Sequence, residues 1–201
     1  MSISQESILN LARRRGLIRS CDLNGWELPR VELTRLVRKG LLERRGRGLY
    51  AVPNQAQVQH QPLAEMACKH PRSIICLFSA LHFHGLIANA PSEVWLAIPN
   101  KARRPAKDRR PLQIVRFSGA ASDTGVEEHD IAGITVRVTS VAKTIADCFK
   151  YRNKIGLYPA LDALAESWKT RRIGMDELWH CAMACRVTNV IRPYMDSLLR
   201  Q

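Results

Sequence analysis

A polar stretch bounded by prolines divides this chain into two parts. The segment PNQAQVQHQP runs from Pro53 to Pro62 and is rich in glutamine. Proline fixes φ and lacks an amide donor, so such a stretch resists both a long helix and a central strand. We therefore expect an N-terminal domain over 1–53, a linker over 54–62 and a larger domain over 63–201.

The charge of the chain is strongly positive and is densest before this linker. Across 201 residues, 31 Lys and Arg oppose 18 Asp and Glu, for a formal net charge of +13. Residues 1–53 hold 11 of these cations and 5 of the anions, hence +6, and the rest of the chain holds 20 and 13, hence +7. Surplus cations steer polyanions toward a protein, which favours nucleic acid, although membranes and acidic proteins also attract basic chains.

Composition excludes several classes of protein. A hydrophobic fraction of 46% is ordinary for a globular chain with a core and excludes wholesale disorder. The longest unbroken apolar run, from Ile74 to Phe78, is far shorter than the roughly 20 residues that cross a bilayer. The first residues lack the apolar segment and cleavage site of a secretory signal. The six cysteines form no Cys-x-x-Cys pair. We therefore expect a cytoplasmic protein with reduced thiols and no membrane span.

The N-terminal domain shows the element order of a winged helix-turn-helix. Ser4 can cap a first helix that Gly16 ends, Pro29 suits the start of a later helix, and Gly40 ends that one. Strand-like runs then surround two glycines of a tight hairpin. The expected elements are helices over 4–16, 17–23 and 29–39 and strands over 41–44 and 49–52.

The third of these helices has an outward face suited to DNA. At about 100° per residue, Leu33, Leu36 and Val37 share one face, which points inward. The opposite face offers arginines that can fork onto guanine and methyl groups that can meet those of thymine. A solvated helix face is the alternative, and the basic hairpin that follows favours DNA. The expected contacts are Arg30, Val31, Thr34, Arg35, Arg38 and Lys39 on the helix and Arg44, Arg45 and Arg47 on the wing.

The second domain mixes strands and helices without regular alternation, which predicts an α+β fold that ends in helices. The expected helices lie over 63–69, 79–85, 140–151, 157–168, 176–184 and 190–199, and the strands over 93–98, 112–117 and 134–138. The pair Glu127-Glu128 beside His129 is interpreted as a solvated loop.

A basic loop lies between the first two strands of this domain. The sequence leaves three interpretations of this loop open: a solvated tip, a second patch that contacts phosphates, or a docking point for an acidic partner. Its cations are Lys101, Arg103, Arg104, Lys107, Arg109 and Arg110.

Several phrases of the sequence occur in the order of a known family. They are PRVELTRLVRKGLLERRGRGLYAVP, LFSALHFHGL, EVWLAIPNKARRP, GVEEHDIAGITVRVTSVAKTIADCFKY and ALDALAESWKTRRIGMDELWHCAM. From about Ser4 to Leu199 the chain resembles the abortive-infection AbiEi-type antitoxins, predicted transcriptional regulators of phage defence in type IV toxin-antitoxin systems. The resemblance implies a winged helix that binds inverted repeats in its own promoter as a repressor, and a second domain that counters a nucleotidyltransferase-like toxin.

One position departs from that family. Where relatives usually carry arginine before threonine, this chain has Lys143, followed by Thr144 and Asp147. Lysine keeps the charge but loses the bidentate fork of arginine. We expect Asp147 to pair locally, either with Lys143 at four-residue spacing or with another neighbour.

The remaining candidates for metal or catalytic chemistry have simpler explanations. His82 and His84, and the group His180, Cys181 and Cys185, offer zinc-type ligands but lack a second paired cluster. We interpret them as packed histidines and buried thiols. Ser140 precedes a helix and is explained as its cap. The strands offer no acidic cluster for Mg²⁺, so we expect no metal, no cofactor and no catalytic residue.

Two functional hypotheses follow. The first is a non-enzymatic, DNA-binding antitoxin and transcriptional autorepressor whose partners are double-stranded DNA and a nucleotidyltransferase-like toxin. The alternative is a winged-helix transcriptional regulator whose C-terminal domain senses a ligand or mediates assembly, without a toxin. A nuclease or nucleotidyltransferase is disfavoured by the missing acidic cluster.

Overall fold

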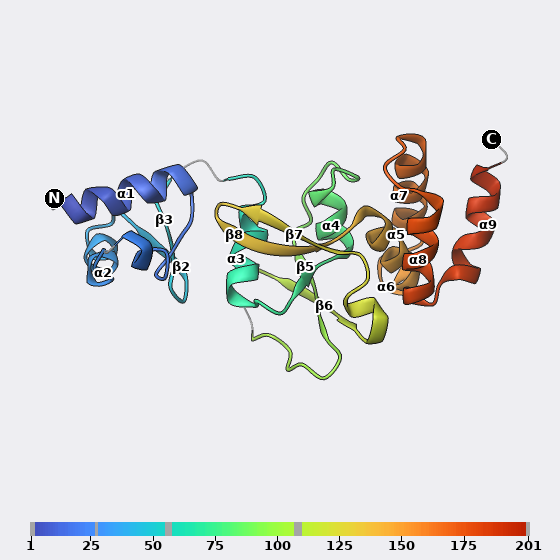
Figure 1. The fold of residues 1–201 in the computed structure, drawn as a ribbon, viewed down its shortest axis with the longest axis horizontal. Coiled ribbons are helices and arrows are strands. Elements are labelled where there is room, and N and C mark those ends of the chain that lie inside the picture. The colour runs from blue at the N-terminus through green and yellow to red at the C-terminus, as the bar shows by residue number, and fades with distance from the viewer. Residues whose placement is uncertain (1–2, 27, 55–57, 107–109, 200–201) are drawn as a thin grey trace. The chain divides into compact units, whose positions relative to one another are not determined.

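The structure of the chain is a computed structural model that describes residues 3–26, 28–54, 58–106 and 110–199. Helices and strands both contribute, which confirms the predicted α+β class (Figure 1). The chain divides into two compact units, residues 1–71 with 130–136 and residues 72–129 with 137–201. Within the described ranges, no helix is long and apolar enough to span a bilayer.

The first unit combines helices with a small antiparallel sheet. Its helices are α1 (Ile3–Arg15), α2 (Val31–Arg38) and α3 (Gln61–Lys69), and its sheet has the order β1-β3-β2, with β1 (Ile18–Arg19), β2 (Glu43–Gly46) and β3 (Leu49–Ala51). From α1 to β3 the first and third predicted helices and the hairpin occur in the predicted order of a winged helix-turn-helix, whereas β1 and a 3-10 helix replace the second predicted helix. Its core consists of Ile8, Leu9, Leu11, Ala12, Ile18, Leu23, Leu33, Leu36 and Leu42.

Glycines end α1 and α2 as predicted, whereas both helix starts differ. Gly16 and Gly40 have φ of +76° and +69°, the left-handed conformation in which helices commonly end. Ser4 lies inside α1 rather than before it, because the first turn already includes Ile3, whose carbonyl accepts the hydroxyl of Ser7 at 3.0 Å. Pro29 lies two residues before α2.

The helix predicted over 17–23 is wrong. Ile18 and Arg19 instead form β1, paired with Tyr50 and Leu49 of β3. The backbone amide and the guanidinium of Arg19 both donate to the carboxylate of Asp22, at 2.8–3.0 Å. This local bonding closes a turn in place of a helix. A short 3-10 helix, η1 (Asn24–Trp26), follows.

The second unit is built on a mixed five-stranded sheet of order β6-β5-β4-β8-β7. β4 pairs antiparallel with β5 and parallel with β8, and β5 pairs parallel with β6. The strands are β4 (Ile74–Ile75), β5 (Val94–Pro99), β6 (Leu112–Phe117), β7 (Val126–Ile131) and β8 (Ile134–Thr139). The tip of the β7–β8 hairpin, residues 130–136, groups with the first unit.

Strand β7 corrects the interpretation of Glu127 and Glu128 as a loop. Both are exposed, as predicted, but they lie in an edge strand beside β8. Acidic residues are rare in strands, so local preference argued against one here. Pairing with β8 outweighs that preference, and the charges on an exposed edge discourage pairing with other chains.

Helices gather at one end of this sheet, as Figure 1 shows for α5 to α9. α5 (Val141–Lys150) is the central one, because α4 (Leu77–Phe83), α7 (Tyr158–Lys169), α8 (Met175–Cys185) and α9 (Thr188–Leu198) all pack against it. Two shorter elements are α6 (Arg152–Ile155) and the 3-10 helix η2 (Gly119–Ser122). Every residue of α5 from Ala142 to Phe149 is buried.

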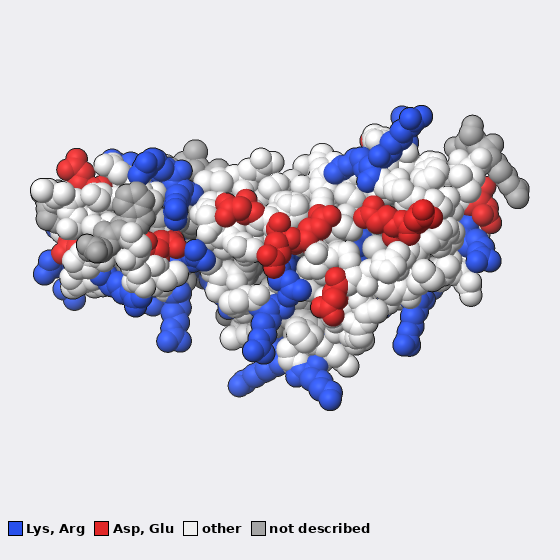
Figure 2. Space-filling model, in the orientation of Figure 1, with Lys and Arg blue, Asp and Glu red and all other residues white. Residues whose placement is uncertain are grey.

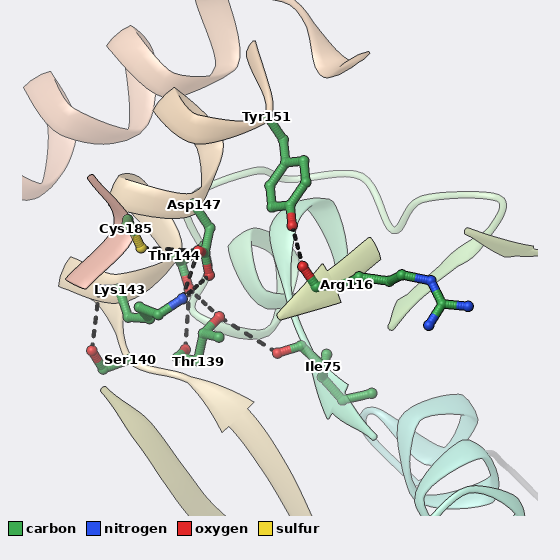
Figure 3. Close-up of polar contacts among 9 residues, drawn as sticks. All are labelled: Ile75, Arg116, Thr139, Ser140, Lys143, Thr144, Asp147, Tyr151 and Cys185. Carbon is green, nitrogen blue, oxygen red and sulfur yellow. Dashed lines mark hydrogen bonds and ion pairs between the residues drawn. The ribbon is translucent and has the colours of Figure 1, made fainter. Parts of the chain in front are cut away.

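The buried residues of α5 include a complete ion pair. The ammonium of Lys143 contacts both carboxylate oxygens of Asp147, at 2.5 and 2.6 Å, and neither side chain is exposed (Figure 3). Burial alone would lower the pKa of Lys143, but the Asp147 carboxylate outweighs it and raises that pKa. Burial also raises the pKa of Asp147, against the lowering effect of the Lys143 ammonium. The pair predicted from the four-residue spacing therefore forms.

Further hydrogen bonds lie beside this pair and at the start of α5. The thiol of Cys185 donates to Asp147 at 3.3 Å, and the hydroxyls of Thr139 and Thr144 lie 2.7 Å apart. Ser140 caps α5, as predicted, by accepting the Lys143 amide at 3.2 Å. Gly125, with φ of +62°, passes so close that a Cβ there would lie 2.6 Å from the Cβ of Lys143.

Removing one partner of the ion pair should destabilise the protein more than removing both. Lys143→Met or Asp147→Leu leaves an uncompensated buried charge, which costs about 3–5 kcal/mol. The double variant should lose less stability than either single variant, as measured by urea unfolding of the full chain. Asp162→Leu, at an exposed position of α7, is the control. Additive losses would show that the two charges do not depend on each other.

Candidate nucleic-acid interface

The outward face of α2 is exposed as the helical periodicity predicted. Leu33 and Leu36 are 1% and 0% exposed, whereas Val31 on the other side is 53% exposed. Thr34, Arg35 and Arg38 are exposed as well. One side of the helix is thus held by the core while the other presents two cations, a hydroxyl and methyl groups.

A buried carboxylate on α2 organises its neighbours. Glu32 accepts the amide of Gln5 from α1 at 2.6 Å and a guanidinium nitrogen of Arg35 at 2.5 Å. Lys39 donates to the other end of the same Gln5 amide at 3.0 Å. The Gln5 hydrogen bond foremost, together with Arg35, lowers the pKa of Glu32, which is therefore ionised at neutral pH.

Gln5 and Glu32 were missed from the sequence. The one signal for them was the spacing of Glu32 and Arg35, three residues apart on a helix. Nothing in the sequence indicated that Gln5, 27 residues before Glu32, would lie against it.

The other cations of the helix are held differently. Arg30 donates to the side chain of Asn24 at 3.1 Å. The side chain of Arg38 makes no hydrogen bond or ion pair with the part of the chain that the structure describes. The guanidinium of Arg38 is therefore available in full to a ligand of the exposed face.

The three arginines of the wing are not equivalent. Arg44 is exposed and donates to the carbonyl of Gly46 at 3.1 Å, and Arg47 is exposed at the turn between β2 and β3. Arg45 is half-buried and forms an ion pair with Glu43. Arg44 and Arg47 therefore offer more positive charge to a ligand than Arg45 does.

Many cations of the first unit lie near the proposed recognition surface. Figure 2 shows Lys and Arg side chains along the lower side of this unit, where α2 and the β2–β3 turn lie in Figure 1, and others along its upper side, where α1 ends. A helix with an exposed basic face beside a basic hairpin has the chemistry to bind a phosphate backbone and to reach base edges.

The basic loop of the second unit follows β5. Lys101, Arg103 and Arg104 are exposed and Arg110 is half-buried, whereas Lys107 and Arg109 lie outside the described residues. Arg116 of β6 anchors the start of this loop by donating to the carbonyls of Pro99, Asn100 and Ala102.

The cysteines and histidines singled out for metal chemistry have other partners. Burial raises the pKa of Cys181 to about 11 and that of Cys185 to about 12, so both are protonated thiols at neutral pH, a poor state for binding a metal. His84 contacts the carbonyl of Thr139 at 2.7 Å, and His82 faces the carbonyl of Ile87 at 3.4 Å. Among the described residues, no group of three such side chains could hold a metal ion.

His84 should make stability fall in mild acid. Burial lowers its pKa, against the effects of the Thr139 carbonyl and Glu127, while Arg172 and His129 lower it further. Below an ordinary pKa of about 6.5, the unfolded chain takes up a proton that the folded chain resists. Stability is therefore lost as the pH falls from there toward the lowered value, and His84→Gln should flatten this loss in urea unfolding between pH 7 and 5. His180→Gln, on an exposed histidine, is the control; an unchanged slope in His84→Gln would contradict the assignment.

Comparisons with known proteins concern both the fold and its first segment. The fold is similar to the crystal structure of the RV2827C protein from Mycobacterium tuberculosis, with a TM-score of 0.60, 16% sequence identity and coverage of 90% of this chain and 71% of that one. None of the curated proteins matches the sequence significantly. A family model described as "Transcriptional regulator, AbiEi antitoxin" matches residues 6–53, which contain α2 and the wing. Residues 6–53 are therefore similar to the AbiEi antitoxin family of transcriptional regulators, in agreement over this segment with the resemblance found in the sequence.

Proposed function

We propose that this protein is a non-enzymatic antitoxin and autorepressor that binds double-stranded DNA through α2 and the wing. In this proposal residues 1–53 bind inverted repeats in the promoter of its own operon, residues 54–62 link the domains, and residues 63–201 counter a nucleotidyltransferase-like toxin in the cytoplasm during phage defence. The observation that carries the DNA-binding part is the exposed face of α2, with Arg35 and Arg38 opposite a buried leucine face.

The chemistry of this surface divides between base edges and phosphates. A helix that enters the major groove can place a guanidinium on the two acceptors of guanine and a threonine or valine methyl on thymine. A hairpin beside the groove lies along the phosphate backbone of the DNA, where contacts depend on charge and carry no sequence information. We therefore assign Val31, Thr34, Arg35 and Arg38 to bases, and Arg44 and Arg47 to phosphates. Arg30, Lys39 and Arg45, which already have partners within the domain, take supporting roles.

Arg38 and Arg47 provide a matched test of this division. Arg38→Ala should weaken binding to a preferred duplex by about 1–3 kcal/mol with little change on a scrambled duplex. Arg47→Ala should weaken both duplexes alike and reduce the slope of log affinity against log salt by about one. Fluorescence anisotropy at several salt concentrations measures both, on a duplex that the protein selects from a random library.

The control for this pair is Arg192→Ala, which removes the same charge from an exposed position on α9. It should leave both duplexes unaffected. Equal losses on the two duplexes for Arg38→Ala and Arg47→Ala would contradict the division of labour. Affinity that does not change with salt would contradict phosphate binding by this surface.

The antitoxin role is supported by the family of the first segment and by the basic loop of the second unit. Lys101, Arg103 and Arg104 are exposed there, and Arg116 fixes where the loop begins. Such a surface fits an acidic partner or a further stretch of phosphate backbone. Because the second unit has a core of its own, its work does not require DNA to be bound.

Repression and protection should therefore separate. The full chain with Arg35→Ala and Arg38→Ala should lose repression of its promoter but still relieve growth inhibition by a nucleotidyltransferase-like toxin encoded beside it. Replacing Lys101, Arg103 and Arg104 by Ala should reduce protection while melting temperature stays unchanged, since exposed charges contribute within roughly 0.5 kcal/mol each. The measurement is growth on co-expression. If the wild-type chain protects against no neighbouring toxin, the alternative of a regulator that senses a ligand or mediates assembly is favoured.

A further inference from the structure

An acidic residue on a DNA-facing helix needs a physical explanation. DNA is a polyanion, so a carboxylate close to it opposes binding unless a cation compensates it. Glu32 lies in the first turn of α2, yet its side chain is only 8% exposed, while its partner Arg35 is 58% exposed. The carboxylate is thus turned into the domain and its partner toward solvent.

The two oxygens of Glu32 have different partners, and together they tie two helices. One accepts the Gln5 amide of α1 at 2.6 Å and the other accepts Nη1 of Arg35 at 2.5 Å. Gln5 is itself buried, and its carbonyl oxygen accepts Lys39 at 3.0 Å. An arginine that otherwise has free rotamers is therefore attached to a buried carboxylate, which is in turn attached to α1.

This attachment leaves part of the guanidinium free. Arginine carries five N–H donors in a planar fork, and the contact with Glu32 uses Nη1. Nε and Nη2 make no hydrogen bond or ion pair with other residues of the described chain. Those two donors lie along one edge of the plane, and two parallel donors are what the N7 and O6 acceptors of guanine require.

We propose that Gln5 and Glu32 are positioning residues that orient the Arg35 guanidinium for a bidentate contact with one guanine of the operator. The inference rests on the proposed DNA-binding function and names the base that α2 reads. Holding a long side chain in its bound conformation reduces the conformational entropy lost on binding, so the carboxylate favours sequence-specific binding while slightly opposing non-specific binding.

The test uses the full chain and duplexes that it selects from a random library. In the selected duplex, each guanine is replaced in turn by 7-deazaguanine, which lacks the N7 acceptor. At one position the wild-type protein should lose about tenfold in affinity, because one of the two hydrogen bonds of the bidentate contact is lost and one arginine donor is left without its acceptor. Arg35→Ala should remove this difference and so identify the position.

Glu32→Gln should also bring the ratio of affinity for the guanine duplex to affinity for the 7-deazaguanine duplex close to one at that position. Its affinity for a scrambled duplex should stay equal or rise, because a negative charge is lost. Gln5→Ala should reduce the ratio in part, since it leaves the Glu32–Arg35 pair in place; it also carries the test if Glu32→Gln unfolds, as judged by melting temperature. Glu6→Gln, on an exposed residue of α1, changes the net charge equally and should keep the wild-type ratio.

Three outcomes would overturn the inference. A folded Glu32→Gln or Gln5→Ala variant with the wild-type ratio would show that the network only supports the fold. The wild-type protein could prefer one duplex and yet show no loss of affinity, dependent on Arg35, at any guanine replaced by 7-deazaguanine. That result would refute the guanine contact but leave the proposed DNA-binding function standing. A wild-type protein that selects no sequence from the library would refute the proposed sequence-specific function as well.

Discussion

The second unit depends on one buried ion pair. Lys143 and Asp147 lie on the central helix α5, fully removed from water, with the ring of Phe117 4.0 Å from the ammonium. Two charges can be buried only when each compensates the other and the remaining oxygens find donors, here the thiol of Cys185. The turn before α5 adds a link to the sheet, because the hydroxyl of Thr139 lies within reach of both the Ile75 carbonyl and Thr144. Sheet and helices are thereby tied at one point.

The first unit also contains a network of opposite charges, but this network lies next to an exposed surface. Its core is apolar, and its polar network of Gln5, Glu32, Arg35 and Lys39 lies at the margin between α1 and the exposed face of α2. There a buried carboxylate holds cations that water and ligands can still reach, whereas Asp147 holds a cation that nothing outside can reach. The same pairing of opposite charges therefore maintains a fold in one unit and shapes a surface in the other.

Much of the fold could be predicted because many signals are local. Glycine ends α1, α2 and α4 through left-handed backbone, serine caps α5, and the strand at 112–117 and the helices α5, α7, α8 and α9 follow their apolar patterns closely. The short elements β4, α6, η1 and η2 were not predicted, and two strands are interpreted from the sequence as other structure. β1 and β7 exist because β3 and β8 lie beside them, and their own residues favour a helix in one case and a loop in the other.

The sequence by itself determined which residue types face outward on α2, because a helical period of 3.6 residues separates Leu33 and Leu36 from Arg35 and Arg38 whatever the rest of the chain does. The similarity of residues 6–53 to the AbiEi antitoxin family follows from sequence as well. Only the tertiary structure decided that Arg35 is attached to Glu32 and Gln5, that Arg45 is paired with Glu43, and that Lys143 and Asp147 are fully buried. The ion pairs themselves join residues two to four positions apart, but their burial and the contact of Gln5 with Glu32 are set by segments distant in sequence. No local pattern records how distant segments meet.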